Sequence, residues 1–334
     1  MKRRRIALAA MAALLLAAPL AALTVGRFPV SISETLAALF PYIAGGRETD
    51  QMVRDVILNI RLPRVLLAML AGAGLGVAGG AFQSLFSNPL ATPDTLGVAT
   101  GASFGAVLGI LLGLPSPLVQ LSALLMGLLS VAIVAAVSRV RGSSPVIMMI
   151  LAGMVVSALF SALVSLVKYV ADPQDVLPAI TFWLMGSLSS ATRGSLAMGA
   201  PMIIFGTALI WLLRWKLNAM TLSDDEAASL GINVKRIRLL VITGAAMITG
   251  SVVSMCGLIG WVGLLIPHAA RMIFGSDNRC VVPASIVLGA LFMLAIDTAA
   301  RSLTASEIPA SILTSVIGAP FFILLLRKTG GVRG

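Results

Sequence analysis

The chain has little charge, few aromatic residues and almost none of the side chains that carry out catalysis. Charged residues make up 11% of its 334 residues and aromatic residues 5%, and there are one histidine, His268, and two cysteines, Cys256 and Cys280. A lone histidine beside a proline favours a local hydrogen-bond role. Two widely separated cysteines form neither a disulfide framework nor a zinc motif. We therefore expect no catalytic residue, no metal site and no cofactor.

A phosphate-binding loop is also missing. The G-x-x-x-x-G-K-[ST] motif needs a glycine directly before a lysine, and no glycine precedes any of the five lysines. The chain therefore cannot bind ATP through such a loop. Any active process in which it takes part would draw its energy from a partner protein or from an ion gradient.

Apolar residues are abundant. They make up 58% of the chain, and the mean hydropathy is +1.02. Apolar runs of about 18 residues or more recur without the strict alternation of barrel strands. We predict an all-α polytopic membrane protein, a single domain over 1–334 with about ten transmembrane helices. The predicted spans are 6–26, 61–82, 93–112, 118–138, 145–168, 192–213, 237–257, 259–271, 281–300 and 309–327.

The first run begins after MKRRR and resembles a signal peptide. At about 20 residues it is longer than a signal h-region, so we interpret it as an uncleaved span, with cleavage left open. Placing the N-terminus inside puts 16 of the 24 lysines and arginines on the cytoplasmic side, including Arg141 and Arg333. Acids such as Glu48 then lie in an outer loop. An even number of spans returns the C-terminus to the cytoplasm. Basic residues at the ends of apolar runs set topology, so membrane lipid is expected as a partner and nucleic acid is not.

Glycine recurs every four residues in the second and third predicted spans. Residues four apart lie along one face of a helix, and small residues there let helix backbones approach closely in lipid. We expect these glycines to pack helices together within one subunit; a dimer seam or a pathway lining is the alternative. They are Gly72, Gly76, Gly80, Gly97, Gly101, Gly105, Gly109 and Gly113.

The most polar stretch of the chain is LSDDEAASLGINVKRIR, at 222–238. Ser223 is a good N-cap, and Glu226 three residues later completes a capping box. Asp224 and Asp225 follow the cap, where the helix dipole favours acids. The pattern predicts a short, rigid helix in an otherwise apolar chain.

The same stretch also contains signals for a stop and a restart. Gly231 is a natural terminator for a helix over 224–230. Asn233 is expected to cap a second short helix, which leads into the next span. On these residues alone the segment is either a capped linker with solvated charges or a docking element for a cytoplasmic protein.

Four stretches carry a family resemblance. They are RLPRVLLAMLAGAGLGVAGGAFQSLFSNPLATPDTLGVATGAS (61–103), LSDDEAASLGINV (222–234), GLIGWVGLLIPHAAR (257–271) and IDTAARSLTASEIPASILTSVIGAPFFILLL (296–326). They resemble the FecCD-type permeases, the membrane subunits of bacterial ABC importers for iron-siderophores, haem and cobalamin. The resemblance covers essentially the whole chain and implies the type II ABC importer permease fold, in the bacterial inner membrane.

The resemblance also implies a function and its partners. The chain would move a metal chelate into the cytoplasm by alternating access. An iron-siderophore is the first choice, then haem or cobalamin, then an oxyanion such as molybdate. A second permease subunit, most simply a second copy, would complete the pathway. Two cytoplasmic ATP-binding subunits would supply the energy, and an extracytoplasmic binding protein would deliver the cargo. The chain itself would not be an enzyme.

Residue roles follow from the same resemblance. The segment around 214–238 would be the coupling element that seats in the ATPase. Three arginines would receive carboxylates from the binding protein, although alone they are ordinary interfacial anchors. The fifth span and the segment 172–190 would line the pathway. The coupling residues are Ser223, Asp224, Asp225, Glu226, Ala227, Leu230 and Gly231, and the arginines are Arg61, Arg64 and Arg301.

A different class of function, an ion-coupled secondary transporter, would need buried ionisable relays. The predicted spans offer Asp297, which lies one turn before Arg301. An i,i+4 ion pair between these two is the plain expectation. The sequence therefore favours an importer that is driven by a separate ATPase.

Overall fold

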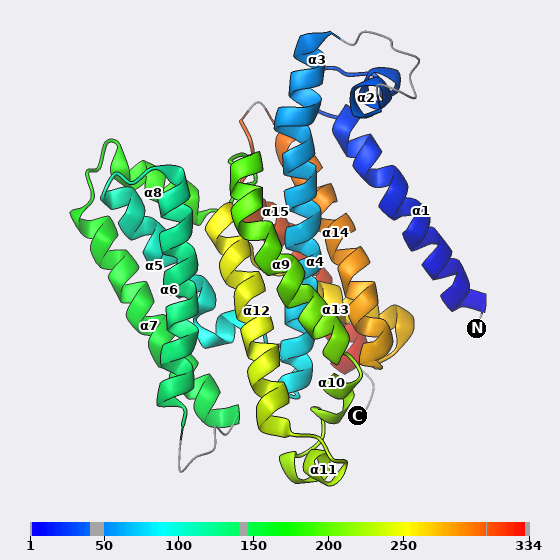
Figure 1. The fold of residues 1–334 in the computed structure, drawn as a ribbon, viewed down its shortest axis with the longest axis vertical. Helices are drawn as coiled ribbons and strands as arrows, with labels where there is room; N and C mark the ends of the chain where they lie inside the picture. Colours follow the sequence, from blue (N-terminus) through cyan, green and yellow to red (C-terminus); the bar gives the residue numbers. More distant parts are fainter. Residues whose placement is uncertain (1, 41–49, 140–145, 305, 331–334) are drawn as a thin grey trace.

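The computed structural model describes residues 2–40, 50–139, 146–304 and 306–330 (Figure 1). Glu48, Arg141 and Arg333, which entered the predicted topology, lie outside the described residues. Within them, ten helices coincide with the ten predicted apolar runs. These are α1 (Lys2–Thr24), α4 (Leu62–Leu85), α5 (Val98–Leu111), α6 (Ser116–Val137), α7 (Val146–Val170), α9 (Arg193–Leu213), α12 (Val234–Cys256), α13 (Val262–Phe274), α14 (Asn278–Ser302) and α15 (Ala310–Gly330).

Length and composition separate these helices into two sets. In the described ranges, six helices are long and apolar enough to cross a membrane, and four shorter apolar helices accompany them. The other elements are short: α2 (Ile32–Leu39), α3 (Gln51–Asp55), η1 (Val56–Arg61), η2 (Pro93–Leu96), α8 (Val176–Leu184), α10 (Lys216–Ala219) and α11 (Asp224–Ser229). The all-helical membrane fold is confirmed.

Three predicted boundaries differ from the structure. The second span begins at Gln51 instead of near 61, because α3, the π-helical stretch η1 and α4 form one continuous helix. The third span loses its first turn, since Pro93–Leu96 forms a 3-10 turn and Gly97 adopts a left-handed φ of 75° before α5 begins. The expected second short helix after Asn233 is the first turn of α12.

The helices form two groups that share α12. In the first group, α4 lies at the centre and packs against α9, α12, α13 and α14. In the second, α5 packs against α6, α7 and α8 at the left of Figure 1. Because α12 contacts α4 and α9 on one side and α5 and α6 on the other, a shift of α12 is felt by both groups.

Glycines on α4 mark its closest helix contacts. A Cβ built on Gly72 would lie 2.0 Å from the carbonyl oxygen of Gly289 in α14, and one on Gly76 would lie 2.9 Å from that of Ser285. Gly80 leaves more room, with its nearest neighbour in α13 at 3.3 Å. The α4–α14 contact is therefore so close that a methyl group at Gly72 would collide with backbone.

Glycines on α5 make the same kind of contact with α6. A Cβ on Gly101 would lie 2.7 Å from the carbonyl oxygen of Met126, and one on Gly105 would lie 2.3 Å from that of Ser122. Gly109 is 3.3 Å from the nearest atoms of α6. Three of the five glycines in the predicted row thus face α6.

The other two members of that row, Gly97 and Gly113, are not in the helix. Both adopt a positive φ, 75° and 65°, at the two ends of α5. The expectation of five glycines along one helix face is corrected to three, because the helix is shorter than its apolar run. Gly97 and Gly113 instead supply the left-handed backbone that turns the chain.

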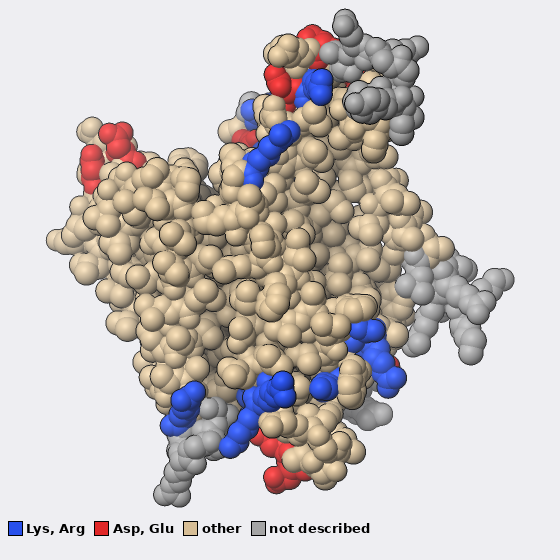
Figure 2. Space-filling view, viewed as in Figure 1, with Lys and Arg blue, Asp and Glu red and all other residues tan. Residues whose placement is uncertain are grey.

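Charge gathers at two ends of the molecule. Figure 2 shows lysine and arginine side chains around α11 at the lower end and a second charged group around α2 and α3 at the upper end. Between them this face is a broad belt without charge. We refer to these as the α11 end and the α2 end. A charge-free belt between polar ends is the surface that a lipid bilayer requires.

Candidate functional site

The polar stretch at 222–238 forms a capped helix at the α11 end. The hydroxyl of Ser223 accepts from the backbone N–H of Glu226 at 3.3 Å, and the Glu226 carboxylate accepts from the backbone N–H of Ser223 at 3.0 Å. The predicted capping box is therefore present. Hydrogen bonds from the Ser223 hydroxyl and then from its backbone N–H hold the pKa of Glu226 below its usual 4.5.

One ion pair and one buried methyl group join α11 to α12. Arg238 of α12 donates to the carboxylate of Asp224 at 2.8 Å, and the arginine side chain is largely buried. Ala227 is 1% exposed and packs into the main core. Ala227 thus holds the helix in place and offers no contact surface. The ion pair therefore fixes α11 to α12.

The remaining residues that were predicted to couple to the ATPase lie on the surface of the protein. Asp225, Glu226 and Leu230 are exposed, and so is Gly231, whose φ is 75°. A hollow of about 1200 Å³ lies beside them, lined by Leu230 and Gly231 together with residues of α10 and α12. The segment is therefore a stiff acidic projection with a groove at its base.

At the α2 end, one cluster of charged side chains is largely buried, and its members pair with one another. Arg64 donates to Asp297 at 2.8 Å and to Glu307 at 2.9 Å, and Arg301 lies 3.6 Å from the second oxygen of Asp297. Asp297 is 0% exposed. The expected pairing of Asp297 with Arg301 is present, but Arg64 is the closer partner. This cluster ties α4 to α14.

Two arginines also hold the end of α1. Arg61 donates to the carbonyl oxygens of Leu23 at 2.7 Å and Thr24 at 3.1 Å. Arg301 donates to the carbonyl oxygen of Val25 at 2.8 Å. The last carbonyls of a helix have no partner within it, so these guanidinium groups satisfy them and fix α1 against α4 and α14.

The three arginines with a predicted docking role are largely buried in this chain. Arg61, Arg64 and Arg301 are 5%, 8% and 7% exposed, whereas carboxylates of a binding protein would need exposed guanidinium groups. The sequence placed them at helix ends, but the helix that contains Arg61 and Arg64 begins ten residues earlier, at Gln51. Within this chain they brace α1, α4 and α14, and their docking role stays a prediction.

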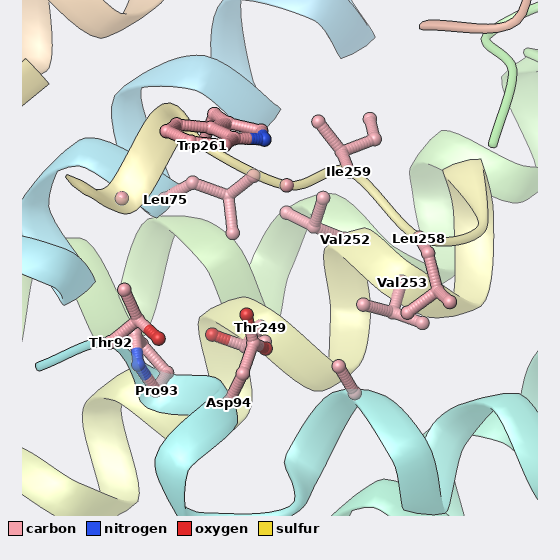
Figure 3. Close-up of a pocket in the computed structure, with 13 residues that line it drawn as sticks. Leu75, Thr92, Pro93, Asp94, Thr249, Val252, Val253, Leu258, Ile259 and Trp261 are labelled. Atoms are coloured by element: carbon pink, nitrogen blue, oxygen red, sulfur yellow. The ribbon is translucent and has the colours of Figure 1, made fainter. Parts of the chain in front are cut away.

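A pocket of about 250 Å³ lies in the interior between α4, η2, α5, α12 and the start of α13. Figure 3 shows Thr92, Asp94 and Thr249 along one side of it and Leu75 and Trp261 along the other. Most of its wall is apolar. Sequence reasoning missed Asp94 and Thr249 as candidate site residues. The available signal was an acid directly after a proline inside an apolar run.

Two of the apolar helices, α7 and α15, expose large apolar side chains. On α7, Ile147, Val155 and Tyr169 are exposed by 69% to 86%. On α15, Val316 and Ile317 are exposed as well. Single exposed apolar residues are ordinary, but a face of this extent requires either lipid or another protein.

Comparison with known proteins gives one consistent result. The family model of the FecCD transport family matches residues 14–328. The chain is 38% identical over 306 residues to the molybdate import system permease protein MolB of Haemophilus influenzae, covering 92% of this chain and 90% of that one. It is 39% identical over 277 residues to a "probable iron chelatin transport system permease protein" of Helicobacter pylori, covering 83% and 84%.

A solved structure extends the similarity to three dimensions. It is described as a metal-chelate type ABC transporter in an inward-facing conformation, and its backbone matches this one with a TM-score of 0.87. The two sequences are 36% identical, and the match covers 97% of this chain and 99% of that one. Both the sequence and the fold are therefore similar over nearly the full length.

Proposed function

The chain belongs to the FecCD transport family and is an ABC importer permease, and from this premise we propose that it moves a metal chelate into the cytoplasm by alternating access. The observation that carries the proposal is the path from α11 to the interior. The exposed acidic projection is fixed to α12 through Arg238, and the same α12 forms a wall of the central pocket. One rigid helix thus joins an outer docking element to an inner cavity.

The α11 element is proposed to seat in a cytoplasmic ATPase. Its exposed acids and its groove offer a surface that a partner can grip, and its capped, ion-paired attachment prevents it from yielding when pushed. Nucleotide-driven motion of the partner would then tilt α12 as a unit. This places the α11 end and both termini in the cytoplasm, in agreement with the excess of basic residues around that end.

The apolar face of α7 and α15 is proposed to meet a second copy of the chain. Two such faces brought together enclose a volume between subunits, and apolar surface of this extent is stable when shared. The pathway would run between the two copies, with α7 and the segment 172–190 along it.

The binding protein is proposed to dock at the α2 end, through residues other than the three arginines expected from the sequence. Arg27, Arg54 and Arg193 are the exposed arginines there in the described ranges. Arginine pairs well with carboxylates through two parallel hydrogen bonds. We assign the contact to these three side chains in place of the buried ones.

The cargo is proposed to be an iron-siderophore, with haem or cobalamin as the alternative within the family. The named cargoes of the two relatives, molybdate and an iron chelatin, both contain a metal. A mostly apolar pocket with a few polar groups suits the organic shell of a chelate better than it suits a bare ion.

The test is uptake by the complete importer in proteoliposomes, with ATPase and binding protein present and a ferric hydroxamate as the probe. Glu226→Ala removes the cap at the α11 end, and we expect uptake per ATP hydrolysed to fall about tenfold, since about 1.4 kcal/mol of coupling is lost. Glu34→Ala removes the matching cap on α2 and serves as the control. Uptake that does not require ATP but depends on a proton gradient would contradict the proposal and favour a secondary transporter.

A further inference from the structure

The hydroxyl of Thr249 in the central pocket has no interaction partner. Thr249 is 3% exposed, and its Oγ1 makes no hydrogen bond to any residue that the structure describes. A buried hydroxyl without a partner costs free energy. Its position past the middle of α12 puts that cost deep in the membrane. An arrangement of this kind is stable when something else in the pocket supplies the missing hydrogen bond.

Asp94 faces the same pocket and is also without a fixed partner. Its carboxylate forms no ion pair or hydrogen bond with another described residue. Its side chain is exposed and borders the hollow. Both side chains line this pocket, and Figure 3 shows them on the same side of it. A carboxylate within the membrane costs free energy, and such residues usually take part in the function of the protein.

The backbone around these side chains has the form of a membrane-depth binding site. Asp94 lies in the 3-10 turn η2, and the loop that contains Gly257 and Trp261 breaks the helical path between α12 and α13. Irregular backbone at this depth is tolerated where protein buries it or where it lines a cavity. Both breaks border this pocket.

The pocket is bordered by elements that contact α7 on one side and α15 on the other. The turn η2 packs against α7. On the other side, the ring of Trp261 meets Phe322 of α15 at 6.4 Å between centroids. A cargo that moves along the proposed pathway between two copies therefore passes the mouth of this pocket.

We propose that Asp94 and Thr249 form a transit site for the cargo, which binds a cationic or hydrogen-bond-donating group of the chelate. This inference rests on the proposed function and narrows its substrate class. The apolar wall receives part of the organic shell, and at about 250 Å³ the pocket holds one end of a chelate. An ammonium, amide N–H or hydroxyl group suits the carboxylate and the hydroxyl. A bare oxyanion is repelled by the carboxylate, most strongly at low dielectric.

A matched pair of probes tests the site. One is a ferric trihydroxamate with a free ammonium group, and the other is the same chelate with that amine acetylated. Trp261 lines the pocket, so replacing the other three tryptophans by Phe, at Trp183, Trp211 and Trp215, leaves it as the reporter. Binding to the full chain in lipid nanodiscs is then read from quenching of Trp261 fluorescence by iron.

The expected result is a preference that depends on the carboxylate. In the Trp261 background, the ammonium probe should bind about tenfold more tightly than the acetylated one, as a charge-assisted hydrogen bond predicts. Asp94→Asn keeps the shape and should abolish the preference. Thr249→Val should weaken both probes about fivefold while keeping the preference. Asp55→Asn, an exposed carboxylate at the α2 end, is the control and should change nothing.

Three outcomes would overturn the inference: equal binding of the two probes by the parent protein, no quenching by either, or a preference that survives in Asp94→Asn. If Asp94→Asn does not fold, unchanged affinity in Thr249→Val overturns it. Failure here is separable from failure of the proposed function, because the nanodisc assay contains no ATP. An importer that takes up chelate with ATP, but shows no role for Asp94, keeps its function and loses only the transit site.

Discussion

The two ends of the molecule contain the same capping device but use their charges in opposite ways. At the α2 end, Ser31 and Glu34 form a capping box on α2, and at the α11 end Ser223 and Glu226 form one on α11. The α2 end then buries three of its arginines against Asp297 and the last carbonyls of α1, whereas the α11 end exposes its acids. A charge near a helix end is therefore a brace if neighbouring backbone covers it and a docking contact if nothing does.

The largest effect is expected from breaking the buried cluster. Asp297→Asn leaves Arg64 and Arg301 with much less compensating charge at a site that is 0% exposed. Breaking a buried ion pair by removing one member costs roughly 3–5 kcal/mol. We expect the unfolding free energy of the purified protein to fall by that amount. Asp225→Asn makes the same chemical change at the α11 end and should leave it unchanged; equal stability of the two variants would refute the contrast.

The helix contact that sets the distance between Arg64 and Asp297 is the next target. A Cβ on Gly72 would lie 2.0 Å from the carbonyl oxygen of Gly289, so Gly72→Ala forces α4 and α14 apart. Overpacking costs about 1–3 kcal/mol, which denaturant or thermal unfolding can measure. Gly194→Ala is the control, since its nearest neighbour lies at 3.8 Å. Comparable losses in both variants would show that close packing is not the cause.

Because each end has a capping box, the same substitution can be compared at both ends. Ser223→Ala and Ser31→Ala each remove one cap, worth about 1 kcal/mol locally. Amide hydrogen exchange in α11 or α2 should therefore quicken about fivefold. In the reconstituted importer, the expected loss of uptake per ATP is confined to Ser223→Ala. A similar loss in Ser31→Ala would remove the functional distinction between the ends.

The smallest effect is a dependence on pH that both ends share. Hydrogen bonds from the Ser31 hydroxyl and then its backbone N–H hold the pKa of Glu34 below its usual 4.5, and Ser223 does the same for Glu226. Because each carboxylate has a lower pKa in the folded chain, its stabilisation is complete above the unfolded value and is lost as pH falls through the folded value.

Hydrogen exchange between pH 6 and pH 3, corrected for intrinsic rates, should therefore show α2 and α11 loosening together only in the acidic part of that range. In Glu34→Gln the change at α2 should disappear while the change at α11 remains. Loosening at neutral pH would mean that another group controls the caps.

The order of the ten apolar helices could be read from the apolar runs, because a span must satisfy its own backbone and cover about 30 Å of hydrocarbon. The capping box around Ser223 was equally readable, since it depends on residues three apart. The start of the second span at Gln51 was not readable, because the polar turns before residue 61 continue the helix only where neighbouring elements support them. The positions of Gly97 and Gly113 outside α5 could not be read from the sequence either, because the ends of that helix also depend on neighbouring elements.

Burial of single polar groups could not be derived from spacing. Arg61 and Arg301 meet the end of α1 across more than 30 and more than 270 residues of chain, respectively. Asp94 and Thr249 come together only because η2 and α12 border one pocket. No local pattern records such contacts, so neither the burial of the arginines nor the place of Asp94 in a pocket could be read from the sequence.

The order of residues by itself determined that this chain lies in a membrane as a bundle of helices, that it contains no ATP-binding loop and that it projects one capped acidic helix. Each of these follows from composition or from neighbours within one turn. Only the tertiary structure decided which charged side chains are buried and paired inside the protein and which are exposed to partners. That choice depends on which backbone covers each side chain, and the covering segments are far away in the sequence.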